Sequence, residues 1–70
     1  MSTAEIHAWQ AGVTLQREGM IPAEMTGIIY PDLMPLLTYE ARLAFDRLGR
    51  TVFCHWCAMG YWDAAAESRS

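Results

Sequence analysis

The sequence predicts a mainly α-helical fold, in which residues 1–70 form a single small domain of three helices with an apolar connector interrupted by prolines. Two observations lead to this prediction. Capping and glycine signals delimit helical segments near residues 3–18 and 38–48, and residues 58–67 consist mostly of strong helix formers. With 53% hydrophobic and 19% charged residues, the chain has enough apolar surface to fold, but its length allows only one core.

The first helix is expected over about residues 3–18. Ser2 is followed three residues later by Glu5, the pattern of a capping box, in which each side chain bonds a backbone N–H at the helix start. Gly19 stands where a left-handed residue would end the helix. Three residues at helical spacing predict its apolar face: Ile6, Trp9 and Val13.

Residues 20–37 are expected to form an apolar connector, because prolines at 22, 31 and 35 forbid one continuous helix. Short helical turns can begin at Pro22 and Pro31. The connector holds more apolar side chains than two helices easily cover, so we expect it to contact a partner; filling of the core between the flanking helices is the alternative. The connector residues expected at this interface are Met25, Ile28, Ile29, Tyr30, Leu33 and Met34.

The second helix is expected to begin after Thr38, which can cap it, and to end at Gly49. Glu40 lies in its first turn, where the helix dipole favours a negative charge. Four residues at helical spacing predict the buried stripe of this helix: Ala41, Ala44, Phe45 and Leu48. Its charged residues fall outside the stripe and predict a solvated face: Arg42, Asp46 and Arg47.

The last segment is expected to be a helix, with a short strand near residues 51–56 as the alternative, because this stretch has strand propensity. The chain is expected to fray over residues 67–70. A helix would place four residues on one face: Phe53, Trp56, Cys57 and Gly60. Val52, Trp56 and Met59 would form an overlapping face.

Two aromatic residues follow each other near the end of the chain. On a helix, Tyr61 and Trp62 cannot both face the same core, so at least one ring is expected near the surface. Tyrosine and tryptophan are favoured anchors of protein interfaces. We therefore expect Tyr61 and Trp62 to belong to an interaction surface, together with the connector residues.

The segment Cys54-His55-Trp56-Cys57 contains a single C-x-x-C motif. Two thiolates at this spacing can bind one edge of a zinc ion, and a dimer would complete a four-thiolate site. The same pair would be redox-active at the start of a helix that follows a strand. The leading interpretation is that Cys54 and Cys57 are small core residues, since a second ligand pair is missing and free cysteine is usually buried.

Composition narrows the classes of function. The net charge is −3, and Arg42, Arg47 and Arg50 are countered by Glu40 and Asp46, which disfavours a DNA-binding helix at residues 38–49. No stretch reaches the roughly 18–20 apolar residues of a membrane span, and the first residues do not form a secretory signal, so we expect a cytoplasmic protein that binds neither nucleic acid nor membrane. No catalytic motif is present, and we do not expect an enzyme.

A small acidic protein-interaction module is the function that the sequence favours. A chain of 70 residues buries only about 60% of its surface, and its two cysteines cannot close a useful disulfide loop, so a partner protein or a homo-oligomer is expected to complete it. It would act as an adaptor, an assembly subunit, or an inhibitor or regulator. Its size and charge also fit the short acidic inhibitors encoded by phages and mobile elements. No cofactor is expected; zinc belongs to the alternative, a metal-binding or redox-sensing dimeric module.

Overall fold

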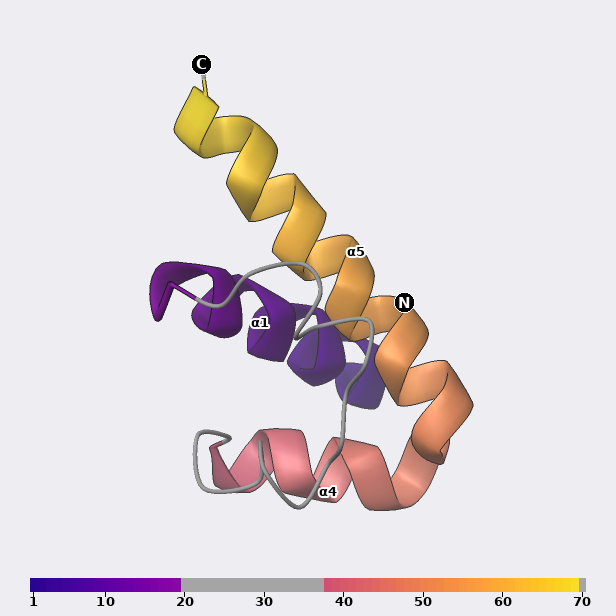
Figure 1. Ribbon diagram of the computed structural model, residues 1–70. Helices are drawn as coiled ribbons and strands as arrows, with labels where there is room; N and C mark the ends of the chain where they lie inside the picture. Colours follow the sequence, from indigo (N-terminus) through magenta and orange to yellow (C-terminus); the bar gives the residue numbers. More distant parts are fainter. Residues whose placement is uncertain (20–37, 70) are drawn as a thin grey trace.

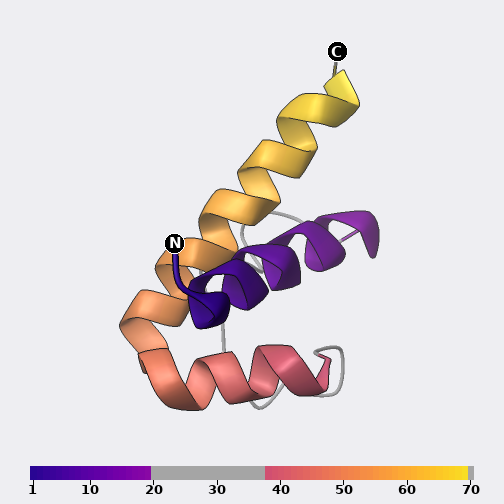
Figure 2. The same ribbon diagram turned by 180° about the vertical axis from the view of Figure 1, so that it is seen from behind.

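The computed structural model describes residues 1–19 and 38–69 of the chain. These residues form three helices, α1 (Thr3–Arg17), α4 (Tyr39–Leu48) and α5 (Arg50–Arg69), which confirms the mainly α-helical prediction. In both views of the ribbon, α1 lies alongside α4 and crosses α5 near its middle, while the C-terminal end of α5 extends beyond the other two helices (Figures 1 and 2). The connector at residues 20–37, with its six expected interface residues, lies outside the described residues.

The predicted capping box begins α1. The Ser2 side chain accepts a hydrogen bond of 3.2 Å from the Glu5 backbone N–H, and Glu5 Oε1 accepts one of 2.7 Å from the Ser2 backbone N–H. Two amide hydrogens that the helix itself leaves without partners are thereby satisfied. At the other end, Gly19 has a φ of 83°, as expected for a left-handed residue after the last turn.

Helix α4 also begins and ends where the sequence indicated. The Thr38 hydroxyl accepts a hydrogen bond of 3.1 Å from the Ala41 backbone N–H. Gly49, with a φ of 82°, donates its N–H to the Phe45 carbonyl at 2.9 Å and separates α4 from α5. A residue with a Cβ atom is strained at this φ, so glycine allows α5 to start immediately in a new direction.

The segment 51–56 is helical, and the alternative of a short strand there does not hold. The Phe53 N–H donates to the Gly49 carbonyl at 3.0 Å, so the helical ladder is in place from the first turn of α5. Burial explains why strand propensity is overridden, since the helix places Phe53 and Cys57 in the core one turn apart. The helix is described as far as Arg69, and the expected fraying of residues 67–70 stays a prediction.

The core of the described residues combines the large side chains of Phe53 and Tyr61 on α5 and Leu15 on α1 with alanines of α1 and α4. Phe53 meets Phe45 edge to face, with ring centroids 5.4 Å apart and an interplanar angle of 74°. Burying a side chain as large as Phe53 or Leu15 stabilises the fold by about 1.5–3 kcal/mol. The buried hydrophobic residues are Ala8, Ala11, Leu15, Ala41, Ala44, Phe53, Cys57 and Tyr61.

Helices α1 and α5 approach each other backbone to backbone at two glycines. A Cβ atom added to Gly12 would overlap the Cys57 carbonyl oxygen and come within 2.7 Å of the Tyr61 nitrogen. A Cβ atom added to Gly60 would overlap the Trp9 carbonyl oxygen. Two glycines facing the opposite backbone therefore set the distance between the two longest described helices.

This close approach corrects the predicted apolar face of α1. The buried residues of the helix are Ala8, Ala11, Gly12 and Leu15, whereas Ile6 is 39% exposed and Trp9 and Val13 are only partly buried. Small residues face α5 because larger ones would hold the two backbones apart. On α4 the prediction is confirmed: Ala41 and Ala44 are buried, Phe45 and Leu48 pack against the core, and the three charged residues are exposed.

Among the described residues, none of the helices combines the length and the apolar character that crossing a bilayer requires.

Candidate functional site

The face of α5 opposite the core is exposed and largely apolar. Val52, Met59 and Trp62 are 42%, 39% and 44% exposed, although all three are hydrophobic. At 100° per residue, they lie on the side of the helix away from Cys57, together with His55 and Ala66, which are also exposed. We call these five residues the outer stripe: Val52, His55, Met59, Trp62 and Ala66.

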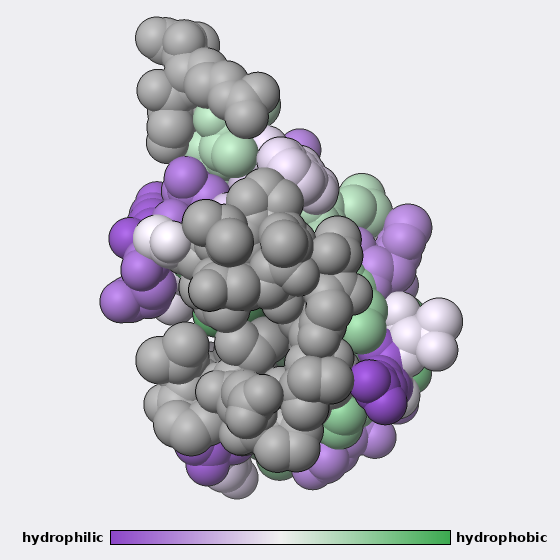
Figure 3. All heavy atoms as spheres, viewed as in Figure 1, coloured by the Kyte–Doolittle hydropathy of each residue, from purple (hydrophilic) through white to green (hydrophobic). Residues whose placement is uncertain are grey.

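Surface colouring by hydropathy shows hydrophobic side chains at the surface on the side of the molecule that α5 occupies, between hydrophilic ones (Figure 3). Four of the five members of the outer stripe, all but Ala66, lie within an uncharged stretch, because residues 51–62 include no Asp, Glu, Lys or Arg. Single exposed hydrophobic residues are common on protein surfaces, but an aligned series without charges is typical of a binding face.

Trp62 is held in place by its neighbour Tyr61. The two rings meet edge to face, with centroids 5.3 Å apart and an interplanar angle of 84°. Tyr61 is only 4% exposed, so it belongs to the core and anchors the ring above it. The two expected interface aromatics thus divide between core and surface, and Trp62 is the one that a partner can reach.

His55 lies one turn before Met59 in the outer stripe and contacts Trp56. Its ring meets the Trp56 ring edge to face, with centroids 5.9 Å apart and an interplanar angle of 78°. Trp56 is partly buried and packs against the core. The outer stripe therefore has two rings, those of His55 and Trp62, that rest on aromatic side chains beneath or beside them.

The sequence prediction placed Val52 and Met59 on a face that overlaps the buried one. The structure separates them from it, because the buried face of α5 is centred on Cys57 and includes Phe53, Gly60 and Tyr61. A signal for the outer stripe was present in the sequence: its members recur at intervals of three and four residues, and those from Val52 to Trp62 lie in a stretch without charge. Only the position of the core decides which of the two apolar faces is left exposed.

The cysteine pair is divided between two environments. Cys57 lies in the core, and burial, with a smaller effect of the nearby Cys54, raises the pKa of its thiol to about 12. Cys54 is partly buried. Among the described residues, no three His, Cys, Asp or Glu side chains are grouped to hold a metal ion. Zinc binding and redox chemistry both need a thiolate, which is unfavourable at Cys57 in this fold. The zinc alternative stays a prediction.

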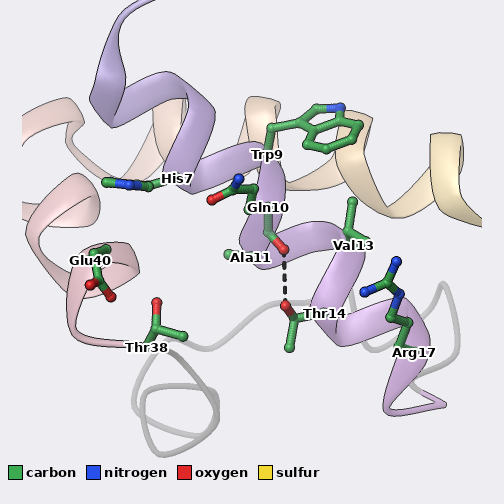
Figure 4. Close-up of a pocket in the computed structure, with 9 residues that line it drawn as sticks. All are labelled: His7, Trp9, Gln10, Ala11, Val13, Thr14, Arg17, Thr38 and Glu40. Atoms are coloured by element: carbon green, nitrogen blue, oxygen red, sulfur yellow. Dashed lines mark hydrogen bonds between the residues drawn. The ribbon is translucent and has the colours of Figure 1, made fainter.

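Two hollows lined by described residues lie between α1 and α4. The larger has a volume of about 560 Å³, with His7, Thr38 and Glu40 at one end and Arg17 at the other (Figure 4). The smaller, of about 400 Å³, shares His7 and Glu40 with it and extends toward Leu43. Both are within the size range of small-ligand sites.

The hydroxyl groups of the larger hollow are already used by the backbone. Thr14 donates its hydroxyl to the Gln10 carbonyl at 3.1 Å, and the Thr38 hydroxyl caps α4. The described side chains of the hollow therefore offer polar contacts to a ligand. Neither of these two hydroxyls is paired with a general base that would activate it as a nucleophile. The expectation that the chain is not an enzyme remains a prediction.

Comparison with known proteins yields no match: no family model, no curated protein and no solved structure is significantly similar to this chain.

Proposed function

We propose that this chain is a small acidic protein-interaction module that binds another protein through the outer stripe of α5, as an adaptor, an assembly subunit or an inhibitor. The observation that carries the proposal is the position of Trp62, which is 44% exposed in line with Met59 and Val52 on the side of α5 away from the core. Leaving these side chains in water is unfavourable, and a partner that covers them recovers the hydrophobic free energy.

The outer stripe also has the qualities of an energetically important contact. Tryptophan is among the residues that contribute most to interface affinity, and the Tyr61 ring restricts the freedom of Trp62 before any partner binds. Charged residues outside the stripe then favour some orientations of a bound partner over others.

The proposal is tested with a photoreactive amino acid in place of Trp62, compared with the same residue in place of Asp46 on α4. Both positions are exposed, but only the first belongs to the outer stripe. In the cells that produce the protein, we expect position 62 to cross-link one defined protein and position 46 not to.

Two variants show whether that cross-link reports a specific surface. Met59→Glu places a charge in the outer stripe and should abolish the cross-link, whereas Leu43→Glu, on α4 and 47% exposed in the wild type, should preserve it. Circular dichroism confirms that both variants remain helical. Identical cross-linking patterns at positions 62 and 46, or a pattern that Met59→Glu leaves unchanged, would contradict the proposal.

A further inference from the structure

The outer stripe has the spacing of a coiled-coil seam. Its members are separated by three, four, three and four residues, which is the pattern of two successive heptads. Its hydrophobic side chains are about 40% exposed in the folded chain, which shows that no other described helix covers this face. A helix that presents such a seam is suited to contact a second helix along its length.

We infer that the outer stripe pairs with the same stripe of a second copy of this chain, with the two α5 helices antiparallel. The inference rests on the proposed function and names its partner. Two copies each carry a net charge of −3, so most contacts between them bring acidic groups together. Residues 51–62 are the part of α5 that can meet a second acidic molecule without that repulsion.

The distribution of charge along α5 selects the antiparallel orientation. Arg50 begins the helix, and its first turn contains no acidic residue. Asp63 and Glu67 lie in the second half, before the terminal Arg69. Antiparallel pairing sets these carboxylates beside the uncharged part of the other helix and nearer to its Arg50, whereas parallel pairing sets carboxylates beside carboxylates.

The residues of the outer stripe also fit each other in this orientation. When the pair is centred between Gly60 and Tyr61, Met59 meets Trp62 of the second copy, and His55 meets Ala66. The first contact joins a flexible thioether to an aromatic ring, a favourable pair. The second sets a ring against a methyl group, so that large and small side chains alternate along the seam.

The size of this contact determines its strength. The outer stripe extends over fourteen residue steps, or about 21 Å of helix, and a single helix face of this length buries well below the roughly 800 Å² per partner of a standard interface. The dimer is therefore expected to be reversible, with monomer and dimer in exchange at micromolar or higher concentration.

Sedimentation velocity over a hundredfold range of protein concentration tests the pairing. The wild type should shift from monomer to dimer as concentration rises. Met59→Glu and Ala66→Arg should remain monomeric while retaining the helical circular dichroism spectrum, and Leu43→Glu should dimerise as the wild type does. Ala66 is exposed in the folded chain, so its replacement tests the contact without disturbing the core.

Cross-linking tests the orientation. In a Cys54→Ser background, a His55→Cys protein mixed with an Ala66→Cys protein should form mixed disulfide dimers under mild oxidation, and His55→Cys alone should form few. Preferential linkage of position 55 to position 55 would overturn the antiparallel arrangement. A wild type that is monomeric at every concentration, or a dimer unaffected by Met59→Glu, would overturn the pairing itself.

The two proposals fail in different ways. A monomeric wild type whose position 62 still cross-links a different protein refutes the self-pairing and leaves the interaction module standing. A monomer without any specific cross-link at position 62 refutes both.

Discussion

The indole N–H of Trp9 on α1 donates a hydrogen bond of 3.0 Å to Oδ2 of Asp63 on α5, 54 positions later in the chain. The Trp56 side chain on α5 makes a small contribution to lowering the pKa of the Glu5 carboxyl on α1. The Trp9–Asp63 hydrogen bond accompanies the backbone contacts of Gly12 and Gly60 where α1 and α5 cross.

Replacement of either glycine at the crossing should destabilise the fold. Gly12→Ala and Gly60→Ala each place a methyl group against the opposite backbone, which cannot move aside as a side chain can. We expect each to lower the free energy of unfolding by about 1–3 kcal/mol in urea denaturation.

The helix propensity of alanine makes this result diagnostic. At a site without contacts, glycine to alanine in a helix stabilises by about 1 kcal/mol. Ala66→Gly, at a position of α5 that is exposed in the single chain, measures that propensity effect in the same helix when the protein is dilute enough to be monomeric. Equal or greater stability of Gly12→Ala and Gly60→Ala would show that the helices do not approach this closely.

The Trp9–Asp63 hydrogen bond should contribute a measurable coupling energy. A double-mutant cycle with Trp9→Phe and Asp63→Ala is expected to give about 0.5–1.5 kcal/mol, near the lower value because the bond is exposed. The control cycle pairs Trp9→Phe with Asp46→Ala on α4 and should give no coupling. A coupling energy indistinguishable from that control would mean that the bond is absent in solution.

The capping box should make stability sensitive to acid. The backbone N–H of Ser2 is the main cause that lowers the pKa of Glu5 below 4.5, with smaller contributions from the Ser2 hydroxyl, the positive charge of the N-terminus and the Trp56 side chain. Because the pKa of Glu5 is lower in the folded chain than in the unfolded chain, the stability that its carboxylate contributes is fully present above pH 4.5. This stability is lost as the pH falls through the folded-state pKa.

Glu5→Gln tests this dependence, because glutamine keeps the capping hydrogen bond but does not titrate. Urea denaturation at several pH values between neutrality and pH 3 should show a smaller acid loss in the variant than in the wild type. Ser2→Ala should destabilise the helix by about 1 kcal/mol at neutral pH. Parallel pH profiles for wild type and Glu5→Gln would argue against the capping interaction.

The buried thiol of Cys57 should make stability sensitive to alkali. Its folded-state pKa of about 12 lies above the ordinary value of 9.0, so the folded chain keeps a proton that the unfolded chain releases. The stability that depends on this group is complete below pH 9 and falls as pH rises toward 12. Cys57→Ala should flatten this part of the profile relative to the wild type, and a Cys54→Ala profile serves as the comparison.

The two cysteines should differ in reactivity toward a thiol reagent such as Ellman's reagent. Cys54 is partly buried and Cys57 fully buried, so we expect one thiol to react in the native protein and the second only on unfolding. Cys54→Ser should remove the native-state reaction. Rapid reaction of both thiols without denaturant would show that Cys57 is accessible and would revive the zinc and redox alternatives.

Local signals in the sequence were sufficient for the boundaries of the described helices. Ser2 and Thr38 cap α1 and α4, and Gly19 and Gly49 follow their last turns, as predicted. These features depend on hydrogen bonds between residues three or four positions apart, so they need no tertiary context. The predicted stripe of α4 also held, because that helix has one apolar face and one charged face.

The face of α1 that is buried could not be read from the same kind of pattern. Ile6, Trp9 and Val13 were the predicted apolar face, yet the residues of α1 that are buried are two alanines, Gly12 and Leu15. Periodicity identifies large apolar side chains, whereas a close crossing selects small ones, and the distance between two backbones is a property of the assembled pair.

The sequence by itself determined the helical class, the helix ends, and the requirement that Tyr61 and Trp62 point in different directions. Only the tertiary structure decided that Tyr61 enters the core and Trp62 the surface, and that Cys57 rather than Cys54 is fully buried. The physical reason is that helix periodicity fixes the angles between side chains on one helix. The close approach of the two backbones at Gly12 and Gly60 then decides which of those side chains face α1 and which face water.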